Sequence, residues 1–362
     1  MMPWPVLDAA PTHLMELPRK ILIGDGVISE LGTLVCCLDA DATDVAIITG
    51  QMVRARVGNE CSSSLNAAGL KYRWFVRSDA SITGVMKIQD SIGDDVPDAV
   101  VGLGGGRSVD VGKMTAYRIG KPFISVPTSA SHDGISSPFV SIRGTEKPHS
   151  IKTITPIGVL ADTRLLLQAP SRLLASGCGD LVAKITAVKD WELARDEKRE
   201  YFGSYAANLA YMSAEIILHE SKGLLQDLGH GIRIIVEALI SSGVAACIAG
   251  SSRPCSGGEH LFSHAVEYLA GTNQHYGLHG EHVGLGTIMM AKLHGLDWEK
   301  IVQTLENVGA PTTAKQLNLT DEQVVQSLIV AQSLRPERYT ILSKAKLDKK
   351  SAFELAKSVS II

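Results

Sequence analysis

Four side chains in the second half of this 362-residue chain have the types and spacing of a metal site. Asp180 follows a glycine, His260 and His264 are four residues apart, and His279 opens a His-Gly-Glu sequence. Residues four apart on a helix share one face, so the two histidines of the pair can point into one cleft. One carboxylate with two or three imidazoles suits zinc or ferrous iron and leaves a coordination position open for substrate.

A glycine-rich segment in the first half could hold a nucleotide. Residues 101–110 have the pattern of a buried strand, a glycine turn and the start of a helix. Backbone amides of such a turn, with the dipole of the following helix, can bind a pyrophosphate. The spacing is not the common GxGxxG, so a plain turn is the alternative, but the place directly after a strand favours a cofactor. The candidate cofactor contacts are Gly104, Gly105, Gly106, Arg107, Ser108, Val109 and Asp110. Together with an open metal site, this cradle indicates a metal-assisted dehydrogenase.

A second polar turn, residues 127–138, follows the next predicted strand and is rich in hydroxyl groups, with one acid, Asp133. Ligands of open α/β sheets bind along the carboxyl edge, where this turn is expected beside the first. A loop whose side chains satisfy its own backbone is the alternative. The hydroxyl density favours a loop on the nicotinamide and substrate side.

Several other residues have competing interpretations. Spacing alone does not rank the two histidines of the pair, and it does not exclude His275 or His282 as metal donors. Lys184, one turn after the metal-capable aspartate, could be its partner or an ordinary surface lysine. The charged residues 190–200 suggest a solvated helix face. Cys178 has no neighbouring cysteine, and its predicted place at a helix start favours a small packed residue.

Short β-branched runs alternate with helical stretches up to about residue 165, which is typical of a parallel sheet flanked by helices. The candidate strands are residues 44–49, 73–76, 99–103 and 122–127. Their spacing leaves room for one crossover helix each. A hairpin is expected within residues 139–160, with a turn near residues 142–145.

After residue 165 the apolar residues recur at three-to-four spacing, which predicts helices. Breaks at residues 251–258 and 271–277 isolate the helix with the histidine pair, and His279 follows in a tight glycine turn. The predicted fold class is therefore α/β: a Rossmann-like parallel-sheet domain, residues 1–165, followed by an all-α domain, residues 166–362. The active site is expected in the cleft between them.

The composition is that of an ordinary globular protein, with 45% hydrophobic and 20% charged residues. A net charge of −3 gives no electrostatic case for nucleic acid or anionic membrane as partner, so a small substrate is expected. Six cysteines without a CxxC pair favour a reducing compartment, and the first twenty residues lack the pattern of a signal peptide. Polar residues interrupt the apolar stretch 232–250, which predicts a core helix, no membrane anchor and a cytoplasmic protein.

These motifs together resemble the sn-glycerol-1-phosphate dehydrogenases, within the wider group of glycerol dehydrogenases, iron-dependent alcohol dehydrogenases and dehydroquinate synthases. The resemblance covers about residues 18–347. It rests on residues 104–113, 127–134, 176–180 and 279–281 and on the histidine pair, in the family's order.

The resemblance implies roles for individual residues. Asp180, His260 and His279 would bind zinc, with Fe²⁺ as the alternative. Asp133 and His264 would hold substrate and serve catalysis alongside Asp180. The implied cofactor contacts are residues 106–110 together with Thr128, Ser129, Ala130, Ser131 and Ser137.

The resemblance also implies the reaction, in which a zinc-polarised carbonyl of dihydroxyacetone phosphate accepts hydride and yields sn-glycerol 1-phosphate, the start of archaeal-type ether lipids. The alternatives are a glycerol or polyol dehydrogenase and a metal-dependent lyase like dehydroquinate synthase. The lyases carry glutamate where Asp180 stands, which counts against them.

Cofactor choice is partly readable. Thr49, Gly50 and Gln51 follow a predicted strand without an acid, and Arg54 is close by, so we predict use of both NAD(H) and NADP(H). For the substrate phosphate the sequence offers Lys147, His149, Lys152 and Arg253 without ranking them. Apolar helices in the second half suggest a homo-oligomer.

Overall fold

The computed structural model describes residues 13–76, 80–144, 150–271 and 276–362. Its first part is built on a six-stranded parallel sheet with the order β1-β8-β5-β4-β2-β3. The strands are β1 (Lys20–Gly24), β2 (Asp44–Thr49), β3 (Lys71–Val76), β4 (Ala99–Gly104), β5 (Phe123–Pro127) and β8 (Gly158–Asp162). Every residue of β4, β5 and β8 is buried, as expected of strands covered on both faces.

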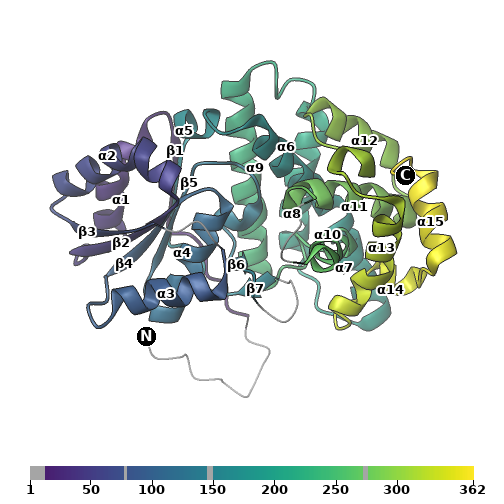
Figure 1. Ribbon diagram of the computed structural model, residues 1–362, viewed down its shortest axis with the longest axis horizontal. Coiled ribbons are helices and arrows are strands. Elements are labelled where there is room, and N and C mark those ends of the chain that lie inside the picture. Colours follow the sequence, from purple (N-terminus) through teal and green to yellow (C-terminus); the bar gives the residue numbers. More distant parts are fainter. Residues whose placement is uncertain (1–12, 77–79, 145–149, 272–275) are drawn as a thin grey trace.

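Helices cover both faces of this sheet (Figure 1). Helices α1 (Leu31–Leu38) and α2 (Gln51–Ala67) share one apolar core with Ile47 of β2, and α3 (Ile82–Ile92) and α4 (Gly106–Ile119) share another with Ile48. Neighbouring residues of one strand thus serve opposite cores, because side chains alternate along a strand. The parallel α/β prediction is confirmed.

The four predicted strands are present as β2 to β5, with β3 starting at Lys71. The strands β1 and β8 are additional, and they pair with each other at one side of the sheet. The expected hairpin is present as the antiparallel strands β6 (Phe139–Ser141) and β7 (Ser150–Lys152). Residue 145 of its predicted turn lies outside the described residues.

After β8 the described secondary structure is helical, as the periodicity predicts. The helices are α5 (Thr163–Leu167), α6 (Ser171–Val182), α7 (Lys184–Lys198), α8 (Ser204–Glu220), α9 (Leu228–Ala249), α10 (Gly258–Ala270), α11 (His279–His294), α12 (Trp298–Asn307), α13 (Asp321–Leu334), α14 (Ile341–Ala345) and α15 (Lys349–Ser358). Short 3-10 helices are η1 (Val27–Glu30), η2 (Asp133–Ile135) and η3 (Ala314–Leu317). The domain boundary after residue 165 stays a prediction.

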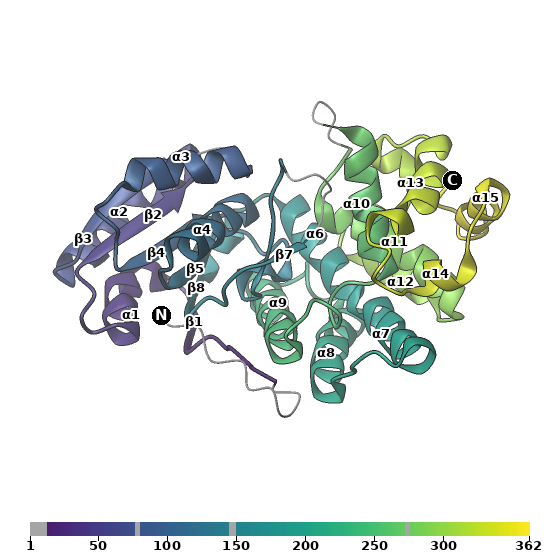
Figure 2. The same ribbon diagram turned by 90° about the horizontal axis from the view of Figure 1, so that it is seen from below.

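Helix α9 stands between the sheet and the helices α7, α8 and α10–α15 (Figure 2). Among the described residues it is the one helix long and apolar enough to cross a membrane by length and composition. Yet 67% of its apolar window is buried within the protein, and Ile235 and Leu239 are part of the helical core, as the core-helix prediction expects. Ser136 Oγ, in the loop after β5, donates to the carbonyl of Ile240 at 2.9 Å. This helix therefore joins the sheet part to the helical part.

Candidate metal and cofactor site

Three of the predicted metal ligands come together from three helices. Asp180 of α6, His260 of α10 and His279 of α11 each offer a ligand atom, and these atoms all lie within 4.8 Å of one another. Asp180 and His260 are buried, and the side chain of His279 is 30% exposed. One carboxylate and two imidazoles form a donor set that fits a zinc or ferrous ion with an open position.

Glycines allow the helices to approach closely enough for this. A Cβ at Gly179 would lie 2.2 Å from the carbonyl oxygen of Gly280, and a Cβ at Gly280 would lie 1.9 Å from that of Ser176. Any side chain at either position would push α6 and α11 apart. These glycines therefore explain why both ligand sequences, Cys-Gly-Asp and His-Gly-Glu, contain one.

The start of α11 fixes His279. This residue opens the helix itself and does not lie in the tight turn that the sequence suggested. The carboxylate of Glu281 accepts a hydrogen bond from the backbone N–H of Leu278 at 2.7 Å and two from Arg172 at 2.6 and 2.8 Å. Such a bond from the third helical residue back to the preceding amide holds a helix start in place.

Lys184 connects Asp180, the predicted metal ligand, to the second polar turn. Its Nζ lies 3.0 Å from Asp180 Oδ2 and 2.9 Å from Asp133 Oδ2, and it donates to the carbonyl of Cys255 at 3.3 Å. The lysine is fully buried, so the surface-lysine alternative is wrong. Burial alone would raise the pKa of Asp180, but Lys184 and His260 together hold it below the usual range.

The main chain of the polar turn reaches the same carboxylate. The backbone N–H of Asp133 donates to Asp180 Oδ2 at 3.1 Å, while Asp180 Oδ1 lies 3.3 Å from His260 Nε2. One oxygen of Asp180 thus takes up the turn and Lys184, and the other faces the histidine. The predicted metal ligand and the predicted substrate residue are parts of one connected site.

Sequence reasoning missed Glu259. Its buried carboxylate accepts hydrogen bonds from the backbone of Gly257 at 2.6 Å and from Thr186 Oγ1 at 2.8 Å, and it lies 2.8 Å from His260 Nδ1. This contact occupies Nδ1 and leaves Nε2 free to coordinate a metal, an arrangement common for metal-binding histidines. The only signal in the sequence is an acid directly before the histidine.

His264 lies one turn after His260 but outside the ligand group. It is buried, its ring centroid is 5.9 Å from that of His279, and neither ring nitrogen has a hydrogen-bond partner within the described part of the chain. Burial lowers the pKa of His264 to about 3, so the ring is neutral. Buried polar groups normally have a hydrogen-bond partner, so an imidazole without one is typical of a residue that binds a ligand. His282 is buried outside the group, and His275 lies outside the described residues.

The two turns that follow β4 and β5 lie side by side. The backbone N–H of Thr128 donates to the carbonyl of Gly104 at 2.9 Å. Helix α4 begins at Gly106 without a side-chain cap, so its first N–H groups are free for an anion. A Cβ at Gly106 would lie 2.2 Å from His132 Nε2, and Ser129 Oγ is buried without a partner in the described structure.

The other predicted cofactor residues differ in what they can offer. Asp110 is buried, with Oδ2 accepting from the backbone of Ser141 at 3.0 Å and Oδ1 without a partner among the described residues. Val109 is buried in the apolar core, so only its backbone is available. Arg107 is exposed, and Ser137 is buried. Gly105, Ser108, Ala130 and Ser131 lie in the two turns or at the start of α4.

Lys113 of α4 holds the second turn in shape. Its fully buried Nζ donates to the carbonyls of Gly134, Ser137 and Phe139 at 2.6, 2.6 and 2.9 Å. Burial lowers the pKa of Lys113 to about 8. The helix that begins at the glycine cradle therefore also fixes the loop that carries Asp133.

Of the phosphate candidates, Arg253 is already engaged. It is buried, forms an ion pair with Glu200 and donates to the carbonyl of Tyr339 at 2.8 Å. Lys152 donates to the carbonyl of Gly250 at 3.0 Å at the surface. Lys147 and His149 lie outside the described residues.

Two other interpretations need correction. Asp190, read as part of a solvated face, is fully buried and accepts from the backbone of Gly258 and Ile341, both at 2.6 Å. Cys178 lies inside α6 and not at a helix start, but it is buried as expected, and burial raises the pKa of its thiol to about 12.

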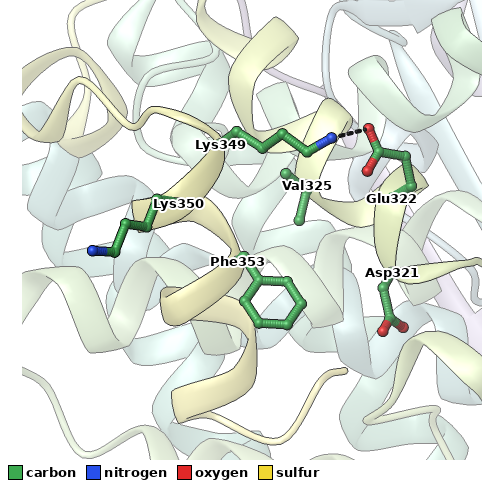
Figure 3. Close-up of a pocket in the computed structure, with 6 residues that line it drawn as sticks. All are labelled: Asp321, Glu322, Val325, Lys349, Lys350 and Phe353. Carbon is green, nitrogen blue, oxygen red and sulfur yellow. Dashed lines mark hydrogen bonds and ion pairs between the residues drawn. The ribbon is translucent and has the colours of Figure 1, made fainter.

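A hollow of about 470 Å³ lies away from this site, between α13 and α15 (Figure 3). Lys349 reaches across it to Glu322 at 3.0 Å, and the ring of Phe353 faces Val325. None of the predicted site residues lines it. Chemistry and geometry therefore favour the metal cluster over this hollow as the functional site.

Comparisons with known proteins agree with this geometry. A family model described as iron-containing alcohol dehydrogenase matches residues 22–170. The chain is similar in fold to glycerol dehydrogenase from Schizosaccharomyces pombe, with a TM-score of 0.81 and 21% identity over 97% of this chain and 91% of that one.

Two curated relatives named glycerol-1-phosphate dehydrogenase (NAD(P)+) are much more similar in sequence. The protein of Nitrosopumilus maritimus is 50% identical, covering 98% of this chain and 99% of its own. The protein of Pyrococcus furiosus is 43% identical, covering 97% and 100%. At this identity over nearly the whole of both chains, the protein belongs to the glycerol-1-phosphate dehydrogenase family.

Proposed function

We propose that this protein reduces dihydroxyacetone phosphate to sn-glycerol 1-phosphate with NADH or NADPH, the step that begins the backbone of archaeal-type ether phospholipids. The main support is the carboxylate of Asp180, which connects two groups of residues. One of its oxygens faces His260, and the other contacts Lys184 and the backbone N–H of Asp133. Metal ligands and the turn beside the cofactor cradle thus form one site. The family relationship supports the reaction.

The chain's own residues supply binding and orientation. Asp180, His260 and His279 would hold the metal, which when bound supplies a Lewis acid that polarises a carbonyl without changing oxidation state. Free amides at the start of α4 would bind the cofactor pyrophosphate. Neutral His264 has one N–H to donate to the substrate oxygen that gains charge. Asp133, held by Lys184, can accept a substrate hydroxyl.

The identity of the metal and the position of the substrate are further parts of this proposal. We infer zinc as the native metal, with Fe²⁺ as the alternative, because one carboxylate and two imidazoles suit both. The substrate would be a small phosphorylated molecule bound between a cofactor domain, residues 1–165, and a helical domain, residues 166–362.

A homo-oligomer in the cytoplasm completes the proposal. Tyr205, Met212 and Ile216 are exposed at spacings of seven and four residues on α8, which places them on one face of this helix. An exposed apolar face of this kind supports self-association. All six cysteines are free, which supports a reducing compartment.

The decisive experiment follows NADPH oxidation with dihydroxyacetone phosphate before chelation, after chelation and after zinc is restored. The product is tested with enzymes specific for each glycerol-phosphate enantiomer. We expect zinc-restorable oxidation that yields the 1-phosphate. An Asp180→Asn variant serves as the control for the metal site.

The same assay separates the alternatives. Equal activity on glycerol and glycerol 1-phosphate would favour a polyol dehydrogenase. Turnover without net change in nicotinamide absorbance would favour a lyase. No oxidation by zinc-loaded protein would reject the proposed reaction.

A further inference from the structure

Arg54 lies in an unusual setting at the edge of the sheet. Its Cζ is 3.9 Å from the ring centroid of Trp74, at a distance typical of a cation–π contact. A Cβ at Gly58 would lie 1.8 Å from Arg54 Nη1, so the guanidinium lies directly over this glycine. The guanidinium is therefore positioned by its contact with the indole of Trp74 and by the space that Gly58, which has no side chain, leaves on α2.

Arg54 also has no acidic partner among the described residues. The acids of β2 and α2 pair with other arginines, Asp44 of β2 with Arg73 at 2.7 Å and Glu60 of α2 with Arg164 at 2.5 Å. Within residues 13–76, 80–144, 150–271 and 276–362 no carboxylate forms a salt bridge with Arg54. The charged fork is therefore available to an anion.

A hollow of about 280 Å³ adjoins this arginine. The described residues that line it are Gln51, Arg54, Ala55, Asn59 and Val76, and none of these is an acid. Helix α2 begins at Gln51 without a side-chain cap, which leaves free N–H groups at this end. Amides, a guanidinium and an asparagine suit a phosphate group.

The hollow lies on the path expected for a dinucleotide. Strands β4, β2 and β3 are neighbours, and Thr49 pairs with both Leu103 and Val76, so the three strands end at one level. The glycine cradle follows β4, and the hollow lies two strands along the same edge, about 10 Å away by ordinary strand spacing. A pyrophosphate on the cradle places a ribose of the cofactor beside β2.

We propose that Arg54, positioned by Trp74, binds the 2′-phosphate of NADP(H) and raises the affinity for this cofactor over NAD(H). Two hydrogen bonds from a guanidinium to a phosphate are strong and directional. The contact with Trp74 already restricts the Arg54 side chain, so less conformational entropy is lost when it binds the phosphate. The inference rests on the proposed function only in that the protein binds a nicotinamide dinucleotide.

The test measures equilibrium binding of NADPH and NADH by nicotinamide fluorescence on the zinc-loaded full chain. Arg54→Gln is compared with wild type and with Arg56→Gln, an exposed arginine of the same helix that does not line the hollow. We expect Arg54→Gln to weaken NADPH binding about ten- to a hundredfold and NADH binding less than twofold. The Arg56→Gln control should bind both like wild type.

A competing ligand and a second variant test the proposed 2′-phosphate subsite separately from the rest of the cofactor site. Adenosine 2′,5′-bisphosphate should compete better than AMP in wild type and equally in Arg54→Gln. Trp74→Leu should weaken NADPH binding in the same direction but less. Equal losses for both cofactors, or unchanged NADPH binding in Arg54→Gln, would overturn the inference while leaving the proposed function intact. Wild-type protein that binds neither cofactor would overturn both.

Discussion

Replacing Glu259 with glutamine tests whether this carboxylate strengthens metal binding by His260 at the proposed metal site. The carboxylate takes Gly257 N–H and His260 Nδ1 at one oxygen and Thr186 Oγ1 at the other. The side-chain oxygen of a glutamine can keep the contacts with Gly257 N–H and His260 Nδ1, and its NH₂ group can donate to Thr186 Oγ1. The Thr186 hydroxyl can then donate its hydrogen to the carbonyl of Ala183 instead. The Glu259→Gln substitution therefore removes the negative charge and preserves the hydrogen bonds.

The size of the effect follows from this geometry. A carboxylate behind a metal-binding imidazole raises the basicity of the ring, and its loss usually lowers metal affinity ten- to a hundredfold. Because Glu259→Gln keeps the hydrogen bonds of Glu259, we expect a loss of metal affinity at the lower end of this range, about tenfold or about 1.4 kcal/mol. The Glu259→Ala substitution also loses the bonds and should approach a hundredfold.

Zinc affinity would be measured by competition with a chromophoric chelator. The matched control is Thr186→Val, which removes a hydroxyl partner of Glu259 but leaves its charge and its contact with His260, and should bind zinc within twofold of wild type. If Glu259→Gln binds zinc as tightly as wild type, then Glu259 does not tune His260 and the reasoning fails.

Three further predictions test other parts of the site. Lys184→Met leaves the buried carboxylate of Asp180 and the partly buried carboxylate of Asp133 without their cation, and we expect chelated protein to lose about 3–5 kcal/mol in urea unfolding; a loss below about 1 kcal/mol would contradict a stabilising role of this ion-pair triad. Gly106→Ala should lower cofactor affinity more than tenfold because its methyl group meets the His132 ring, and adding His132→Ala should restore part of it. At pH 8 a thiol reagent should modify only Cys36 and Cys37 in native protein and six thiols after denaturation, since the other four are buried with raised pKa values.

Sequence patterns predicted the sheet because its central strands are continuous apolar runs. Strands β1 and β8 were not predicted, because each holds a run of only three apolar residues, 21–23 and 159–161, and so short a run cannot be told from a helix segment by periodicity. The clusters around Asp180, His260 and His279 could be selected from residue types. Their separation from His264 could not, because both histidines of α10 share one face.

Burial explains the remaining differences. Lysine and aspartate are almost always exposed unless paired, so Lys184 and Asp190 look like surface residues in any sequence. Both are fully buried because partners far along the chain surround them: Asp133 and Cys255 for Lys184, and Gly258 for Asp190. Such partners come from tertiary contacts that no local pattern encodes.

The three hydrogen bonds of Lys113 have a consequence for how the two ligands influence each other. The same helix begins at the cofactor cradle and, through Lys113, holds the carbonyls of Gly134 and Ser137 beside Asp133. A cofactor that binds at the start of this helix and orders it would also order the proposed substrate loop. Thermodynamic reciprocity then requires that substrate tighten cofactor binding by the same factor by which cofactor tightens substrate binding.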